Sequence, residues 1–238
     1  SKEHIEAKIS IASKAASLVK DGDCIFLDGG TTIAPMIDFI QDKKIRIVTH
    51  NLLIPQRVQN MDVDIFLIGG HYSHFHASTV GVFAEKMVSQ FHFDHAFFGC
   101  SGIELVHQMA YNDDIDTIPV KEVAMKYATH NYLLADASKL GVTSYCRFNP
   151  LSAFDLIISD HNDNMPDGLP SNLYLPTFPD PSNRPWQKPE QYLVSNIYRA
   201  TPKFPYAKNS SEWQEALDHF PKPPVFHFPY WASACLIS

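Results

Sequence analysis

The residues best suited to chemistry follow a short apolar run near the start of the chain. This run ends in the stretch DGGTT, which comprises Asp28, Gly29, Gly30, Thr31 and Thr32. A turn that leaves a parallel strand and enters a helix directs free backbone N–H groups at one point, where an anion is favoured. The stretch therefore predicts a phosphate or carboxylate site, and the alternative is a tight turn capped by threonine that needs no ligand. It is neither a Walker A loop nor a G-x-G-x-x-G turn, so no nucleotide cofactor is predicted.

Small and polar residues follow four further apolar runs. They are Thr49 and Asn51, then Gly69 and Gly70, then Ser101 and Gly102, and finally Asp136, Ser138 and Lys139. If these runs are parallel strands, the residues meet at one edge of the sheet, where open α/β folds bind ligands. Hydroxyl and amide groups with one lysine suit a polyol phosphate, with Lys139 as the point charge for the phosphate. Taken singly, each residue is better explained by loop solubility or capping, and the prediction rests on their coincidence at five consecutive strand ends.

The elements that must position these residues alternate along the first 160 residues. Strands are predicted at 24–28, 45–49, 64–69, 95–99, 132–136 and 155–160, and helices near 3–20, 32–41, 52–60, 81–90 and 119–129. This alternation predicts a layered, Rossmann-like α/β domain with a parallel sheet and right-handed crossovers.

Beyond residue 161 the composition changes. All three tryptophans and most of the prolines lie in 162–238, and proline removes the hydrogen-bond donors that a central strand needs. We predict one domain over 1–161 and an irregular or appended tail over 162–238, with one short helix at 210–220. The tail's aromatic residues raise the alternative of an interaction or oligomerisation module.

Charge and composition exclude several classes of function. The formal net charge is −7, which argues against a DNA-binding surface on these residues, because such a surface is basic. The four scattered cysteines predict reduced thiols. The sequence has no apolar run of transmembrane length and no signal-peptide pattern, so we expect a cytoplasmic protein without membrane partners. Because the chain lacks an initial methionine, we expect a processed product or a fragment.

Several linked motifs resemble the C-terminal effector domain of DeoR-type bacterial transcriptional regulators. They are IASKAASLVKDGDCIFLDGGTT, IVTHN, IFLIGGHYS, STVG, HAFFGCSGI and LADASKLG, in the family's order and spacing from about residue 3 to 160. The resemblance implies a fold similar to ribose-phosphate isomerase and the CoA transferases. It also implies a phosphorylated-sugar effector, a homo-oligomer, and repression of a carbohydrate operon through a helix-turn-helix segment that these residues lack. The implied pocket positions are Asp28, Gly30, Thr31, Thr32, Thr49, Asn51, Gly69, Gly70, Ser101, Gly102, Asp136, Ser138 and Lys139.

The sequence departs from the family pattern in the acidic segment before Lys121. Where the family usually has glutamates, this chain has Thr117 and Pro119. We expect the acidic side of the pocket to be altered, or to be supplied by the aspartates of the preceding loop, Asp113, Asp114 and Asp116.

Two further readings compete with a sensor. An isomerase or deaminase needs a carboxylate or histidine base, and Asp28, Asp136 and the loop aspartates are candidates, but none lies in a catalytic motif. His71, His74 and His76 could bind a metal, although their spacing fits neither a helical pair nor a zinc finger. We favour binding without turnover and predict no catalytic residue and no metal site.

Overall fold

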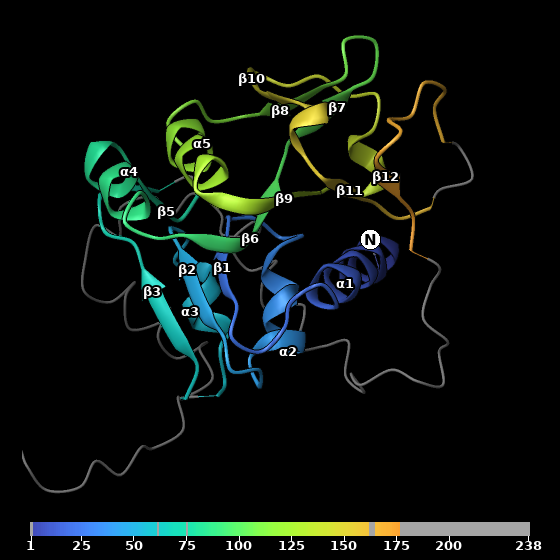
Figure 1. Cartoon of the computed structure of the whole chain (residues 1–238). Coiled ribbons are helices and arrows are strands. Elements are labelled where there is room, and N and C mark those ends of the chain that lie inside the picture. Colours follow the sequence, from blue (N-terminus) through green and yellow to red (C-terminus); the bar gives the residue numbers. More distant parts are fainter. Residues whose placement is uncertain (1, 61, 75, 162–164, 177–238) are drawn as a thin grey trace, which may run out of the picture. The chain divides into compact units, whose positions relative to one another are not determined.

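The computed structural model describes residues 2–60, 62–74, 76–161 and 165–176 (Figure 1). The predicted tail helix at 210–220 and nearly all of the aromatic tail residues lie outside this part of the chain. Seven strands form the central sheet: β1 (Cys24–Leu27), β2 (Arg46–Thr49), β3 (Asp64–Leu67), β6 (Phe93–Gly99), β9 (Ala128–Leu134), β11 (Leu156–Ile158) and β12 (Leu173–Tyr174).

All pairings in this sheet are parallel, in the order β12-β11-β9-β6-β1-β2-β3. The predicted α/β fold with a parallel sheet is therefore confirmed, and each of the six predicted strands is present. Parallel register brings the carboxyl ends of β9, β6, β1 and β2 to one edge, so the loops that follow them are neighbours.

Strand residues face two cores alternately, as period-two geometry requires. Phe26 and Phe98 point into a core beneath α4 (Val82–Val88) and α5 (Ile118–Lys126). Ile25, Leu27 and Phe97 point into a second core beneath α1 (Lys2–Ala16). Both sheet faces are thus covered, which explains the continuous apolar runs of the strands.

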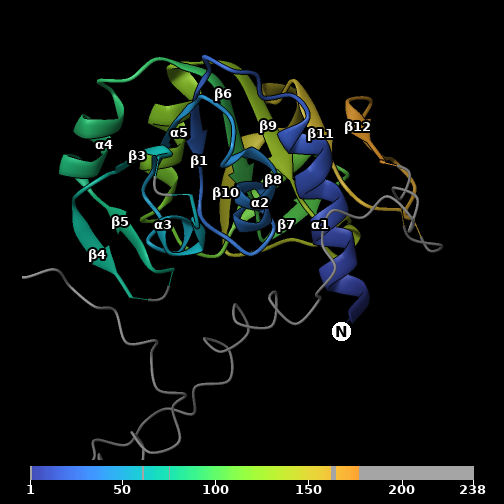
Figure 2. The same cartoon turned by 90° about the horizontal axis from the view of Figure 1, so that it is seen from below.

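Helices α1, α2 (Ile37–Ile40) and α3 (Leu53–Arg57) cover one face, with the 3₁₀ helix η1 (Ala34–Met36) leading into α2 (Figure 2). On α1, Ile11, Ala12 and Ala15 are fully buried at steps of three and four residues. Of these three residues only Ala12 belongs to the pattern from which a helix over 3–20 was predicted, and the helix ends at Ala16.

Two small antiparallel sheets were not predicted. One contains β7 (Gly102–Glu104), β8 (Met109–Asn112) and β10 (Cys146–Pro150), and the other pairs β4 (His71–Ser73) with β5 (Ser78–Val80). The helix predicted over 119–129 ends at Lys126, because β9 begins at Ala128 and pairs with β6 from there. Short strands inside loops give too little alternation to be detected from the sequence.

The central sheet continues beyond residue 161 through β12. Leu173 and Tyr174 pair with Ile157 and Ile158, and the Lys14 ammonium of α1 lies 4.5 Å from the centre of the Tyr174 ring. The Asn172 side chain donates hydrogen bonds to the carbonyls of Leu151 and Phe154, at 3.0 and 2.7 Å. Residues 165–176 therefore contribute one edge strand and its anchoring contacts.

Candidate functional site

Asp28 lies at the carboxyl end of β1 and is the centre of a buried polar cluster. It is only 4% exposed. Its Oδ1 accepts hydrogen bonds from the Gly29 amide at 2.7 Å and from His50 Nε2 at 2.9 Å. Its Oδ2 accepts a bond from the Gly99 amide at 3.0 Å and contacts Lys121 Nζ at 2.9 Å. Four donors from four segments of the chain thus surround this carboxylate.

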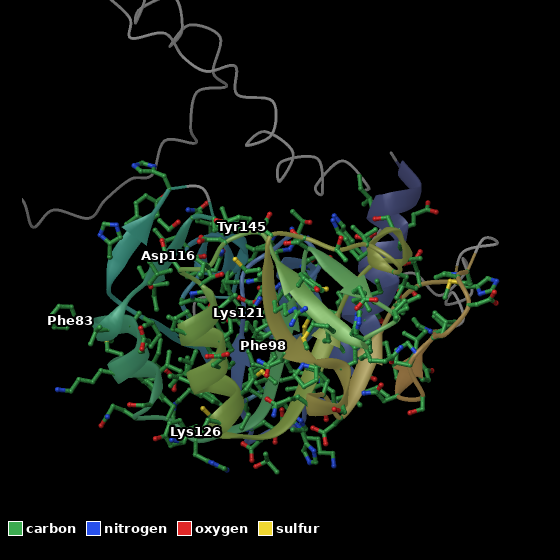
Figure 3. The ribbon with its side chains drawn as sticks, turned by 90° about the horizontal axis from the view of Figure 1, so that it is seen from above. Phe83, Phe98, Asp116, Lys121, Lys126 and Tyr145 are labelled. Carbon is green, nitrogen blue, oxygen red and sulfur yellow. The ribbon has the colours of Figure 1, made fainter. Side chains whose placement is uncertain are left out.

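Lys121 enters the cluster from α5 and is 3% exposed (Figure 3). Besides Asp28, its ammonium donates to the carbonyl of Gly99 at 2.8 Å and to Asn112 Oδ1 at 3.1 Å. It also lies 4.5 Å from the centre of the Phe148 ring, which adds a cation–π contact. Three acceptors match the three N–H donors of the ammonium, so its charge is satisfied within the protein.

The cluster keeps Asp28 ionised. Burial by itself raises the pKa of a carboxyl group, but the Lys121 ammonium and the hydrogen bond from His50 outweigh burial and hold the pKa of Asp28 well below its usual range. Because each oxygen already accepts two hydrogen bonds, Asp28 has little capacity left to take a proton from a substrate.

The loop after β2 is held by buried hydrogen bonds. Thr49 Oγ1 donates to the Leu27 carbonyl at 2.7 Å, and Asn51 Nδ2 donates to the His76 carbonyl and to Ser78 Oγ, each at 2.9 Å. Thr49 is fully buried and Asn51 nearly so. These two predicted site residues lie next to Asp28, but their contacts join the loop to β1 and β5.

The turn after Asp28 is open to solvent on its outer side. Gly30 has a φ of +118°, a conformation that L side chains rarely adopt, and both Gly30 and Thr31 are exposed, whereas Thr32 is half-buried. The Lys8 ammonium of α1 donates to Thr31 Oγ1 at 2.7 Å. The helical elements that follow, η1 and α2, are only three and four residues long, so a helix dipole is a weaker source of attraction here than predicted. Positive charge at this turn comes from Lys8.

A second polar turn follows β9. Asp136 is buried and caps the 3₁₀ helix η2 (Ala137–Lys139), accepting hydrogen bonds from the amide and hydroxyl of Ser138. Ser138 is exposed and Lys139 is half-buried. The two lysines Lys121 and Lys139 both act on the thiol of Cys100, although desolvation prevails and raises its pKa to about 12. This thiol is therefore not a thiolate nucleophile near neutral pH.

The remaining predicted positions have packing roles in the structure. The Ser101 amide donates to the Tyr111 carbonyl at 2.8 Å, and a Cβ on Gly102 would lie 2.4 Å from the Val142 carbonyl oxygen. Gly69 and Gly70 are exposed near α4, where a Cβ on Gly70 would lie 2.8 Å from the Val80 carbonyl oxygen. All thirteen predicted positions thus lie at the same edge of the sheet or in the loops that adjoin it.

The acidic segment that departs from the family pattern supports the cluster indirectly. Asn112 Nδ2 donates to Thr117 Oγ1 at 3.0 Å, while Asn112 Oδ1 accepts from Lys121. Thr117 thereby fixes the orientation of the amide that holds Lys121. Pro119 lies in the first turn of α5, where its missing N–H costs nothing.

The loop aspartates lie near one of the three histidines. His76 Nε2 is 3.4 Å from Asp114 Oδ2 and 3.7 Å from Asp113 Oδ1, whereas His71 and His74 are exposed. Within the described ranges, no three histidine, cysteine or acidic side chains form a group able to hold a metal ion.

Four residues of this site were not among the predicted positions: Lys8, His50, Asn112 and Lys121. Of these four, Lys121 was the easiest to predict from the sequence, because it is a lysine on the buried side of α5 beside Ile118, Val120 and Ala124. A charged residue at a core position needs a partner, and the acid that ends β1 could have been proposed as that partner. No comparable sequence pattern marks Lys8 or Asn112 as a site residue.

Comparison with known proteins gives a consistent result. The sequence model of one protein family, the DeoR C terminal sensor domain, matches residues 3–161. The chain is 34% identical over 161 residues to the uncharacterized HTH-type transcriptional regulator FruR of Bacillus subtilis. It is 30% identical over 164 residues to the lactose phosphotransferase system repressor of Staphylococcus epidermidis. Each alignment covers 67% of this chain and 64% of the relative, so the chain spans less than two thirds of the length of these relatives.

Among solved structures, ribose 5-phosphate isomerase A of Methanocaldococcus jannaschii matches with a TM-score of 0.43 and 18% identity. That match covers 59% of this chain and 55% of the isomerase. No helix in the described part of the chain is both long and apolar enough to span a membrane.

Proposed function

We propose an effector-sensing function for this chain, which belongs to the DeoR C-terminal sensor domain family. In this proposal the intact protein is a repressor of a carbohydrate operon. Its DNA-binding helix-turn-helix precedes the residues present here, and its sensor domains associate as a homo-oligomer. The relatives named as an HTH-type regulator and as a lactose phosphotransferase system repressor support this reading.

The proposed effector is a phosphorylated sugar. The observation that supports it best is the exposed turn Gly30–Thr31 with the Lys8 ammonium 2.7 Å from the Thr31 hydroxyl, because a lysine beside hydroxyl and backbone donors favours a phosphate. Ser138 and Lys139 supply a second hydroxyl–lysine pair after β9, two strands away from β1. Adjacent strands are about 4.8 Å apart, so the two turns are separated by roughly 10 Å, which suits the length of a sugar phosphate.

The same geometry favours binding over conversion. Aldose–ketose isomerisation requires a base with a free lone pair beside a carbon-bound proton. Asp28 is occupied by four donors, and Asp136 is buried and accepts from Ser138. We assign Asp28 to the positioning of the strand-end loops, and we assign contact with the ligand to Lys8, Thr31, Ser138 and Lys139.

Signalling would then proceed by linkage. A ligand that binds Lys8 and Thr31 together favours the arrangement in which α1 lies against the turn. Because α1 is the first element of the domain, a change in its position is transmitted to the segment that precedes it in the intact regulator. Operator affinity of the intact protein should therefore change when the effector binds, and the effector's affinity should change equally when operator DNA binds.

The test is a thermal-shift titration of the full chain with a panel of sugar phosphates, the matching free sugars and inorganic phosphate. A ligand at one hundred times its dissociation constant stabilises the fold by about 2.7 kcal/mol. We expect a shift with one sugar phosphate and no shift with its free sugar. Lys8→Met and Thr31→Val should each remove the shift, while Lys126→Met, which replaces an exposed lysine, should retain it.

Two results would contradict the proposal. If no sugar phosphate shifts the melting temperature, the site does not bind this class of ligand. If a ligand is found and chromatography shows its conversion to product, the protein is an enzyme of the isomerase or deaminase type.

A further inference from the structure

A short loop, residues 140–145, follows the second hydroxyl–lysine pair of the proposed site and is fixed at both ends. At its start the Gly141 amide donates a hydrogen bond to the Ile103 carbonyl at 2.8 Å. At its end Cys146 begins β10 and pairs with Asn112 of β8, whose side chain belongs to the buried polar cluster. The loop is therefore held against the edge of the sheet at which the ligand is proposed to bind.

The same loop flanks the backbone that separates the two turns assigned to the ligand. In the sheet order β6 lies between β1 and β9, so residues 99–102, at and after the end of β6, lie between these turns. The Val142 carbonyl packs directly against Gly102, where an added Cβ would lie 2.4 Å from its oxygen. Burial raises the pKa of the Cys100 thiol, and Lys139 is among the charges that oppose this shift, so its ammonium lies near the same stretch. A ligand that reaches from one turn to the other thus passes beside loop 140–145.

Two loops at this edge carry large apolar side chains that are open to solvent. In loop 140–145, Tyr145 is 81% and Val142 41% exposed, and in the loop after β8, Ile115 is 61% exposed. Because β8 and β10 are antiparallel, the loop that follows β8 and the loop that precedes β10 leave the small sheet at the same end. Figure 3 shows Tyr145 and Asp116, which belong to these two loops, along the same edge of the molecule. The polar site thus has apolar side chains on one flank.

The chemistry of a sugar phosphate has a use for such side chains. Its phosphate and hydroxyl groups require cationic and hydrogen-bonding partners, a role already assigned to Lys8, Thr31, Ser138 and Lys139. Its closed ring also presents a face of C–H groups, whose transfer from water to an apolar contact is favourable. A tyrosine suits this face because it combines a broad apolar ring with a polar hydroxyl at its tip. An acyclic polyol phosphate has the same phosphate and hydroxyl groups but no rigid face of this kind.

We propose that the effector is bound as a cyclic sugar phosphate and that the Tyr145 ring covers one face of the sugar. This inference deepens the proposed function and rests on it, because the phosphate and hydroxyl groups are held by the residues assigned there. Tyr145 is six residues beyond Lys139, so one short segment supplies both a phosphate contact and the ring contact. Tyr145 is thus a specificity-determining residue, which discriminates between ligands that share a phosphate but differ in ring closure.

The test measures dissociation constants of the full chain by isothermal titration calorimetry. The probes are the 6-phosphates of glucose, mannose, galactose and fructose, each beside the alditol 6-phosphate obtained from it by borohydride reduction. Reduction opens the ring and leaves the carbon chain and the phosphate unchanged. We expect a sugar phosphate that binds to do so at least about tenfold more tightly than its alditol phosphate, because the reduced chain has no fixed face for the tyrosine and loses more conformational freedom on binding.

Substitution of Tyr145 separates the ring contact from the phosphate contact. Tyr145→Ala should raise the dissociation constant of the cyclic sugar phosphate roughly tenfold and change that of the alditol phosphate little, whereas Tyr145→Phe should retain most of the affinity. Lys8→Met should weaken the binding of both ligands. Phe83→Ala is the matched control, since Phe83 is 77% exposed but lies on α4 (Figure 3), and it should leave both dissociation constants unchanged. The melting temperature of each ligand-free variant verifies its fold.

The outcomes distinguish this inference from the proposed function. Equal affinity for a sugar phosphate and its alditol phosphate overturns the inference, as does a Tyr145→Ala protein that binds the sugar phosphate as tightly as the wild type. Both results leave the proposed function standing, because a phosphorylated ligand is still bound. If no sugar phosphate of the panel binds to the wild type, both proposals are contradicted, since there is then no sugar ring for Tyr145 to cover.

Discussion

Lys121→Met is the most informative perturbation of the buried cluster. Methionine has similar length and packs well in apolar surroundings, so the change removes the charge with little change of volume. It deletes the contacts to Asp28, Gly99 and Asn112, and it leaves the Asp28 carboxylate buried with hydrogen bonds from His50 and two backbone amides. Removing one partner of a buried pair costs about 3–5 kcal/mol, because the remaining charge is uncompensated.

The expected loss can be read in two assays. Urea denaturation at pH 8 should show a free energy of unfolding lower by about 3–5 kcal/mol. Thermal melting should show a decrease of about 6–20 °C, since each kcal/mol corresponds to roughly 2–4 °C for a domain of this size. Lys126→Met is the control on the same helix (Figure 3), and its exposed position predicts a change within about 0.5 kcal/mol.

The pH dependence gives an independent criterion. In the wild type the pKa of folded Asp28 is depressed, so its ionised form stabilises the fold above the unfolded pKa of about 3.9, and this contribution is lost as pH falls toward the folded value. Without Lys121, burial raises the pKa of Asp28, and the folded variant takes up a proton more readily. The deficit of Lys121→Met should therefore be smaller at pH 5 than at pH 8.

The double variant Asp28→Asn with Lys121→Met should lose less stability than the sum of the two single variants, because the buried charges are removed together. The reasoning is refuted if Lys121→Met costs no more than Lys126→Met, or if its deficit is the same at both pH values.

Two further changes test the packing around the site. Gly102→Ala should destabilise the protein by about 1–3 kcal/mol in urea denaturation, because the added Cβ would lie 2.4 Å from the Val142 carbonyl oxygen. Gly141→Ala is the comparison: its φ is +75° and nothing lies within 4 Å of the added Cβ, so its cost measures backbone strain without a clash. Phe98→Ala should lower the free energy of unfolding by about 3–5 kcal/mol, because Phe98 is fully buried and its ring contacts those of Phe26, Phe148 and Phe154. Tyr145 is exposed, so an equal loss for Tyr145→Ala would show that burial is not the cause.

The fold was predictable because the central strands are buried on both faces. Runs such as the one ending at Leu27 are continuously apolar and stop abruptly at polar loops, so both the strands and the edge at which their loops meet could be read from the sequence. The antiparallel strands were missed because none of them is a continuous apolar run; His71–Ser73 and Gly102–Glu104 are examples. The pairing of Tyr111 with Arg147 also joins residues that lie far apart in the sequence.

The site was predictable by location but not by the role of each residue. A polar residue at a strand end can face a ligand or bind the neighbouring loop, and the sequence does not distinguish the two. Asn51 illustrates this ambiguity, since its amide is used entirely within the protein by His76, Ser78 and Leu53. Lys8 illustrates the converse, because only the packing of α1 brings it to Thr31, twenty-three residues away.

The short strand β12 has a practical consequence for the choice of expression boundaries. The family match ends at residue 161, yet the sheet and its anchoring contacts continue to Tyr174. A protein trimmed at 161 would lose the Asn172 side chain, leaving the carbonyls of Leu151 and Phe154 without these donors, and would expose the backbone edge of β11. An uncovered edge of this kind invites intermolecular strand pairing. Trimming after residue 176 keeps the edge protected and gives the more soluble starting material for crystallisation or ligand screening.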